Sequence, residues 1–61
     1  MIDPTPKDLG RKVRYRDYSP QHPDGRWIEG ALDGFGRMYV TVELANGCRD
    51  LNRVDVEFVG P

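Results

Sequence analysis

Two side chains in this 61-residue sequence could form a nucleophile–base pair or contribute to a Cys/His metal site, and each is the only one of its type: His22 and Cys48. A thiolate activated by histidine needs both side chains in contact and a third group that orients the imidazole. Zinc sites need three or four clustered ligands. We therefore expect no metal site, with His22 a solvated loop residue and Cys48 a small residue on a half-buried strand.

The carboxylates do not form an evident acid–base pair, which would require two groups whose environments separate their pKa values. They are spread singly along the chain: Asp17, Asp24, Glu29, Asp33, Asp50 and Asp55. The glycines do not precede a helix N-terminus or a Lys-Ser/Thr pair, as a phosphate-binding loop would require. We therefore expect no catalytic residue and no cofactor, and a binding protein rather than an enzyme.

The aromatic residues outnumber what the core of so small a domain needs. Our first hypothesis is that four of them line an exposed groove for a partner: Tyr18, Trp27, Phe35 and Tyr39. Flat rings on such a surface bind peptides, methylated cations or bases. In the other interpretation, Trp27 and Phe35 close the ends of the fold or lie in a contact with a second copy of the chain.

A short basic stripe supports an alternative partner, nucleic acid. Lys12, Arg14 and Arg16 alternate with apolar residues, so on a strand they project from one face at intervals of about 6.8 Å and are able to contact phosphates. The whole chain has a formal charge of −1, unlike a general nucleic-acid binder. The same stripe also fits a charged strand that protects a sheet edge.

The elements that position these residues are short β-strands. Alternating apolar residues predict strands at 12–16, 26–32, 38–44, 48–51 and 55–59. Asn46-Gly47 is a strong hairpin signal, Gly30 predicts a sharp bend, and the Pro-Asp-Gly turn signal predicts a loop of about nine residues at 17–25. Thr5, Pro6 and Asp8 have the pattern of a capped helical turn, and a single 3₁₀ turn is expected at 52–54.

The chain has room for one small core, which we predict from the apolar positions of these strands: Val13, Tyr15, Ile28, Leu32, Val40, Val42, Leu44, Leu51, Val54, Val56 and Phe58, with help from Leu9 and Phe35. A core of this size gives marginal stability, and self-association is a common remedy. We expect an all-β fold, a small five-stranded SH3-like barrel with a short 3₁₀ turn before the last strand. The barrel spans residues 7–59, between tails at 1–6 and 60–61.

Four segments resemble small SH3-like-barrel proteins of phages and other mobile elements: Asp8 to Tyr15, Glu29 to Leu32, Tyr39 to Val42 and Asp55 to Phe58. The resemblance covers about residues 7–59. It implies a fold and a mobile-element origin rather than an activity.

The architecture is also similar to that of the type II plasmid dihydrofolate reductases, through Leu9 to Val13 and Trp27 to Gly30. Those enzymes line a tetramer pore with Val-Gln-Ile-Tyr-Pro. Here the corresponding stretch is Arg-Asp-Leu-Asn-Arg at 49–53, without the Gln, Ile and Tyr, so the activity is not carried over. An oligomeric reductase-like enzyme is our third hypothesis, after a protein-binding or self-associating module and a nucleic-acid-binding barrel.

The cysteine content and the distribution of apolar residues indicate the cellular compartment of the protein. A single cysteine excludes an intrachain disulfide, whereas small secreted domains usually depend on such bonds. The N-terminus has no apolar run typical of a signal peptide, and no stretch of 18 apolar residues occurs. We expect a cytoplasmic protein that does not engage a membrane.

Overall fold

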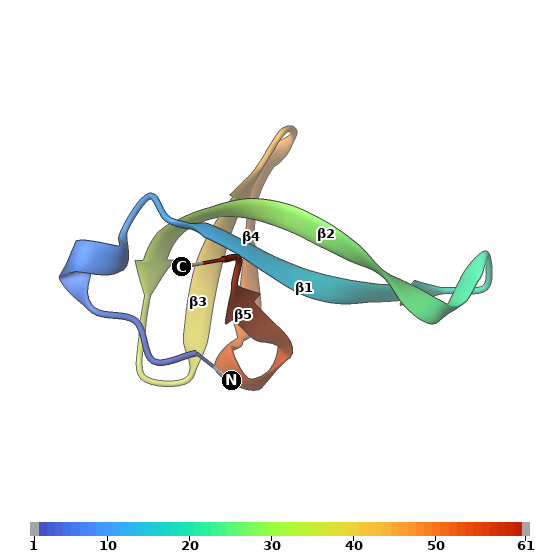
Figure 1. The fold of residues 1–61 in the computed structure, drawn as a ribbon, viewed down its shortest axis with the longest axis horizontal. Coiled ribbons are helices and arrows are strands. Elements are labelled where there is room, and N and C mark those ends of the chain that lie inside the picture. The colour runs from blue at the N-terminus through green and yellow to red at the C-terminus, as the bar shows by residue number, and fades with distance from the viewer. Residues whose placement is uncertain (1, 61) are drawn as a thin grey trace.

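The fold is all-β, as predicted, and a computed structural model describes it from Ile2 to Gly60 (Figure 1). It consists of five strands and two 3₁₀ turns, in the order η1 (Pro6–Asp8), β1 (Lys12–Ser19), β2 (His22–Phe35), β3 (Tyr39–Leu44), β4 (Gly47–Asn52), η2 (Arg53–Asp55) and β5 (Val56–Phe58). The 3₁₀ turn before the last strand is confirmed. No helix of residues 2–60 is long and apolar enough to cross a membrane.

All five strands form one antiparallel sheet in the order β4-β3-β2-β1-β5. The sheet coils because β2 bends, and β3 and β4 run across the direction of the β1–β2 hairpin (Figure 1). At Gly30, where the sequence predicts a bend, β3 lies too close for a side chain. A Cβ there would lie 2.5 Å from the Glu43 carbonyl oxygen and 2.6 Å from Val42 Cγ1. The sheet does not close, so β4 and β5 are its two edges in the part of the chain that is described.

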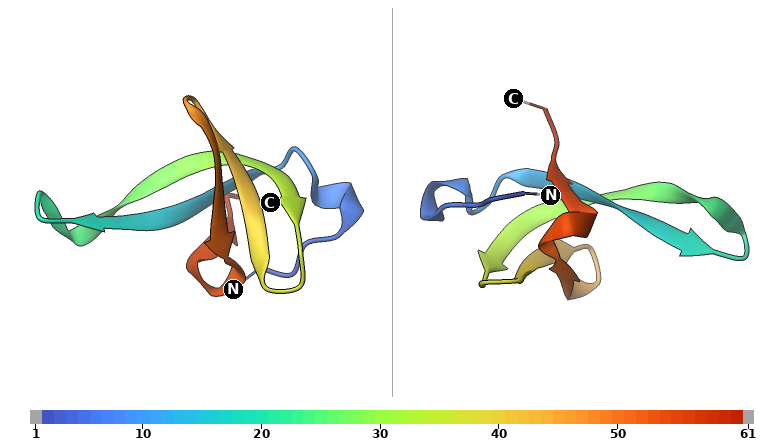
Figure 2. Two further views of the ribbon diagram at one scale, coloured as in Figure 1. Left: turned by 180° about the vertical axis from the view of Figure 1, so that it is seen from behind. Right: turned by 90° about the horizontal axis from the view of Figure 1, so that it is seen from below.

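The predicted loop at 17–25 is wrong. β1 continues to Ser19 and β2 begins at His22, so only Pro20 and Gln21 connect them. The Pro and Gly residues that predicted a loop lie instead within the hairpin. Its turn and a register irregularity between Asp17 and Ser19 accommodate them. The hairpin projects beyond the rest of the molecule (Figure 2), which measures 35 × 22 × 22 Å.

A similar extension occurs at the other end of β2. The sequence predicts that the second strand ends at residue 32, but β2 continues as far as Phe35, with a register irregularity between Leu32 and Gly34. The extra residue, Asp33, shifts the alternation, so that Phe35 pairs with the buried Val40.

The core largely agrees with the sequence prediction. Six predicted residues are buried: Val13, Tyr15, Leu32, Val40, Val42 and Val56. Ile28, Leu44, Leu51 and Phe58 are partly buried against them. Three predictions are wrong, since Val54 is 55% exposed, Leu9 50% and Phe35 36%. Val54 and Leu9 lie at 3₁₀ turns, Val54 within η2 and Leu9 at the end of η1, where no alternation directs a side chain inward. Phe35 lies at the end of β2, beyond the register irregularity at Leu32/Gly34.

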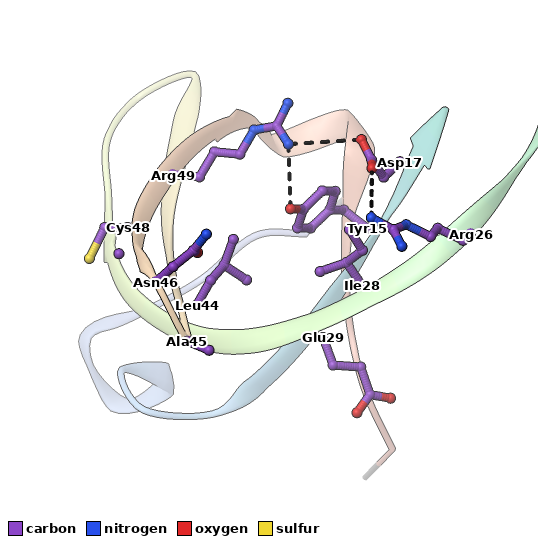
Figure 3. A pocket seen from close by; sticks show the side chains of 11 residues that line it. Tyr15, Asp17, Arg26, Ile28, Glu29, Leu44, Ala45, Asn46, Cys48 and Arg49 are labelled. Carbon is purple, nitrogen blue, oxygen red and sulfur yellow. Dashed lines mark hydrogen bonds and ion pairs between the residues drawn. The ribbon is translucent and has the colours of Figure 1, made fainter. Parts of the chain in front are cut away.

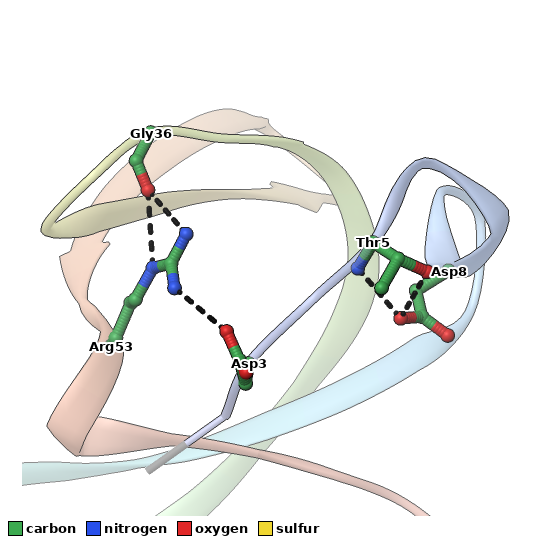
Figure 4. A network of polar contacts seen from close by, with 5 residues as sticks. All are labelled: Asp3, Thr5, Asp8, Gly36 and Arg53. Carbon is green, nitrogen blue, oxygen red and sulfur yellow. Dashed lines mark hydrogen bonds and ion pairs between the residues drawn. The ribbon is translucent and has the colours of Figure 1, made fainter.

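The N-terminal segment, assigned to a tail from the sequence, contributes the buried Ile2 to the core. Arg53 anchors it (Figure 4): its guanidinium donates to the Gly36 carbonyl (3.1 and 2.6 Å) and to Asp3 (3.2 Å). Its backbone carbonyl accepts from Ile2 N–H at 3.2 Å, and its N–H donates to the Met38 carbonyl at 3.1 Å. Met1 and Pro61, which belong to the predicted tails, lie outside the described residues.

Candidate binding surfaces

A hollow of about 250 Å³ brings together side chains from the β1–β2 hairpin, η2 and β5. We call it the aromatic groove, and its lining residues are Arg16, Tyr18, Trp27, Val54, Asp55, Val56 and Glu57. Three large apolar side chains in it are exposed to solvent: Tyr18 by 66%, Val54 by 55% and Trp27 by 43%. Two of the four aromatic residues predicted to line a partner site therefore share one surface.

Local geometry holds each of these side chains in place. Trp27 lies opposite Arg16 in the β1–β2 ladder. The Tyr18 ring rests against Gly25, where an added Cβ would lie 2.9 Å from a ring carbon, and Gly25 has a positive φ of 83° that few other residues adopt. Val54 is fixed on η2, because its N–H donates to the Asn52 side chain at 3.1 Å. The groove thus exists before any partner arrives.

Two arginine side chains of the same chain lie over the Trp27 ring. The guanidinium carbons of Arg14 and Arg16 lie 4.1 and 4.7 Å from the ring centroid, within the range of cation–π attraction. Arg14 also forms a close ion pair with Glu57, with nitrogen–oxygen distances of 2.5 and 2.6 Å. Among residues 2–60, by contrast, the Asp55 carboxylate has no hydrogen bond or ion pair, although it lines the same hollow.

Phe35 and Tyr39 do not join the aromatic groove. Phe35 lies eight residues beyond Trp27 on β2, a distance of about 26 Å along a strand that rises near 3.3 Å per residue. It pairs with Val40, and Tyr39 pairs with Asn52 of β4. The alternation of apolar residues did not predict this separation, because it indicates neither the full length of β2 nor the register irregularity between Leu32 and Gly34.

The basic stripe does lie on the outward face of β1, but carboxylates within the fold match two of its three charges. Lys12 pairs with Glu29 at 3.6 Å, and Arg14 pairs with Glu57 of β5. Arg16 donates to the Asp24 carbonyl at 2.6 Å. In the ladder, Arg14 is flanked by Glu57 on one side and Glu29 on the other. This row of alternating charge offers a weak field to a phosphate backbone.

A larger hollow of about 790 Å³ separates β4 from the β1–β2 hairpin, and we call it the inner groove (Figure 3). Tyr15, Ile28 and Leu44 supply its apolar floor. Above the floor, Asp17 lies between two guanidinium groups, 3.6 Å from Arg26 and 4.0 Å from Arg49. Arg49 also approaches the Tyr15 hydroxyl at 3.5 Å. Sequence reasoning missed this groove, because its residues come from four strands whose relative placement depends on the bend of β2.

The two residues with nucleophilic or metal-binding chemistry have different surroundings. His22 lies at the end of the hairpin, where its backbone N–H donates to Ser19 Oγ at 3.2 Å. Cys48 is exposed rather than half-buried, with its sulfur 3.8 Å from an Asp33 oxygen and with Glu43 close by. Desolvation, followed by the charges of Asp33 and Glu43, raises the pKa of the Cys48 thiol. The thiol is therefore protonated at neutral pH and a weak nucleophile.

Comparisons with protein-family models, with curated proteins and with solved structures gave no match for this chain.

Proposed function

We propose that this chain is a small, non-enzymatic binding module that engages an extended segment of a protein partner through the aromatic groove. The single observation that carries the proposal is the exposure of Tyr18, Trp27 and Val54 in one hollow. The core has its own apolar residues and does not use these three. Exposed apolar groups gathered from separate elements, with polar neighbours, mark interaction sites more often than isolated ones do.

The chemistry of the groove indicates what the segment carries. An apolar residue fits against Tyr18 and Val54, and a lysine or arginine nearby pairs with the Asp55 carboxylate, which has no partner in the described chain. The guanidinium groups of Arg14 and Arg16 already lie over the Trp27 ring. We therefore assign Trp27 a supporting role, as part of the wall of the aromatic groove. Tyr18 is the expected centre of the binding energy, since tyrosine is enriched among residues that dominate interfaces.

The finer description of the fold belongs to the same proposal. We assign the chain to the SH3-like barrels, with an origin in a phage or another mobile element and a cytoplasmic location. The strand order β4-β3-β2-β1-β5 and the 3₁₀ turn before β5 support the barrel type. The mobile-element origin rests on the sequence resemblance alone, and the location on the single cysteine.

Nucleic-acid binding through Lys12, Arg14 and Arg16 has less support than a protein partner. The carboxylates of Glu29 and Glu57 already neutralise Lys12 and Arg14, and stacking of a base on Trp27 would have to displace a guanidinium group. The reductase-like hypothesis also has little support, because its sequence motif is missing at 49–53.

Selection from a displayed library of random peptides tests the proposal. We expect enriched sequences that combine an apolar and a basic residue, and Tyr18→Ala should weaken their binding by at least about ten-fold, as for a residue central to an interface. Tyr39→Ala is the matched control, because Tyr39 is a tyrosine of similar exposure (56%) outside the groove, and it should leave the affinity unchanged. Equal losses in the two variants, or selected peptides indifferent to both, would refute the assignment.

A further inference from the structure

The longer free edge of the sheet is β4. Its only strand partner among the described residues is β3, which it pairs with along its full length from Gly47 to Asn52. Its first four residues are exposed. An edge strand presents a row of backbone N–H and C=O groups that another strand can pair with. The opposite edge, β5, is only three residues long and offers a much shorter template.

The inner groove runs beside this edge. Gly47, Cys48 and Arg49 of β4 form one wall, and Asp17 and Arg26 of the hairpin form the other. In Figure 3, Arg49 and Arg26 reach toward Asp17, whereas Cys48 and Glu29 point away from the centre. A strand added to β4 would therefore lie along the groove, with every second side chain directed at its floor.

The charges in the groove do not balance. Arg26 and Arg49 share the single carboxylate of Asp17, at 3.6 and 4.0 Å. Glu29 does not correct this excess, because it pairs with Lys12. One guanidinium thus has no carboxylate of its own, and both are about half exposed, at 56% and 53%. A carboxylate on an incoming strand would form an ion pair with the unmatched guanidinium group, in the geometry that guanidinium groups favour.

A second copy of the chain does not fit this edge. When two identical edge strands pair antiparallel about a two-fold axis, one residue lies opposite its own copy. The two registers that use most of β4 are centred on Arg49 or on Asp50, so each sets like charges directly across the ladder, which is destabilising. Head-to-tail pairing with β5 of another copy would align only half of β4.

We propose that the β4 edge and the inner groove together accept an extended strand from a different protein, one that places an acidic residue opposite Arg49 and a basic residue opposite Asp50. Main-chain hydrogen bonds to β4 give affinity, and the two charge pairs set the register. This site is separate from the aromatic groove and does not depend on the function proposed for it.

Two capped peptides of identical composition test the proposal on the isotopically labelled protein by NMR. Thr-Val-Lys-Glu-Val-Thr, aligned antiparallel to residues 52 to 47, sets Lys opposite Asp50 and Glu opposite Arg49; Thr-Val-Glu-Lys-Val-Thr reverses both pairs. We expect the first to shift the backbone amide signals of β4 and the Arg49 side chain, and to bind about ten-fold more tightly than the second, given two cross-strand charge pairs.

A charge-exchanged variant, Arg49→Asp with Asp50→Arg, should reverse the preference for the two peptides. Tyr18→Ala should leave this binding unchanged, which separates the site from the aromatic groove. Equal affinity of the two peptides for the unaltered protein, shifts confined to other strands, or a β4-mediated oligomer in solution would each overturn the proposal, and these readouts do not depend on the variant folding.

Discussion

Arg53 links the N-terminal segment to the turn between β2 and β3. Its guanidinium binds the Gly36 carbonyl and Asp3, and its backbone holds Ile2 and Met38. The side chain is 21% exposed, so its bonds to the β2–β3 turn are partly shielded from water. Its role could not be predicted from the sequence, because all its partners are distant along the chain.

Truncation of Arg53 should therefore destabilise the fold. We expect Arg53→Ala to lower the free energy of unfolding by about 2 kcal/mol, the scale of hydrogen bonds that involve a charged group. Urea denaturation measures the effect. Arg37→Ala is the control, since Arg37 is exposed and forms no contact of this kind in residues 2–60; a loss as large in the control would contradict the role assigned to Arg53.

Asp8 makes a pH-dependent contribution at the start of the chain. The Thr5 backbone N–H, at 2.8 Å, and then Arg11, at 3.0 Å, lower the pKa of Asp8 from its ordinary value of 3.8. A carboxyl whose pKa is lowered by folding stabilises the protein above its unfolded pKa, and the stabilisation is lost as pH falls through the folded pKa.

Replacement of this carboxyl should reveal that dependence. We expect Asp8→Asn to be less stable than the unaltered protein at neutral pH, with the gap closing as the pH falls below 3.8. Unfolding by urea at a series of pH values measures it. A gap that is constant with pH would show that the charge of Asp8 is not what stabilises η1.

Among the elements, β2 and β3 approach each other so closely at Gly30 that no side chain fits there. The nearest atom to an added Cβ is a backbone oxygen of Glu43, at 2.5 Å, which cannot move without disturbing the ladder. Gly34 lies on the same strand, but its nearest neighbour would be 3.8 Å away.

Alanine at the two positions should therefore have different effects. Gly30→Ala should cost about 3 kcal/mol, at the upper end of the usual cost of overpacking, which is a large share of the stability of so small a domain. Gly34→Ala should be nearly neutral. Thermal unfolding of the two variants compares them directly, and similar melting temperatures would contradict the steric account.

The number of strands and their order along the chain could be predicted from the sequence, because alternation and the Asn46-Gly47 signal are local. The extent of β1 and β2 could not. Pro20, Pro23 and Gly25 are typical of loops, and only the pairing of β1 with β2 shows that the hairpin includes them. The same limit applies to the aromatic site: Tyr18 and Trp27 meet because the hairpin is long, and Phe35 is separated from them because β2 is irregular near its end.

At the scale of the whole molecule, the two proposed surfaces use different parts of an open sheet. The projecting hairpin, η2 and β5 form the aromatic groove, and β4 with the inner side of the hairpin forms the inner groove. The hairpin contributes to both. A small chain thereby offers two candidate binding surfaces, and two residues of its core, Tyr15 and Val56, also line them.

Binding of partner segments in the aromatic groove can be measured by titration of the labelled protein with a selected peptide, with NMR signals read for the Trp27 indole N–H and for the backbone amides of Tyr18, Val54 and Asp55. We expect these four signals to shift together and to saturate, whereas the Phe35 and Tyr39 amides stay in place. Shifts centred on Phe35 and Tyr39, with the four signals unchanged, would contradict binding in the aromatic groove.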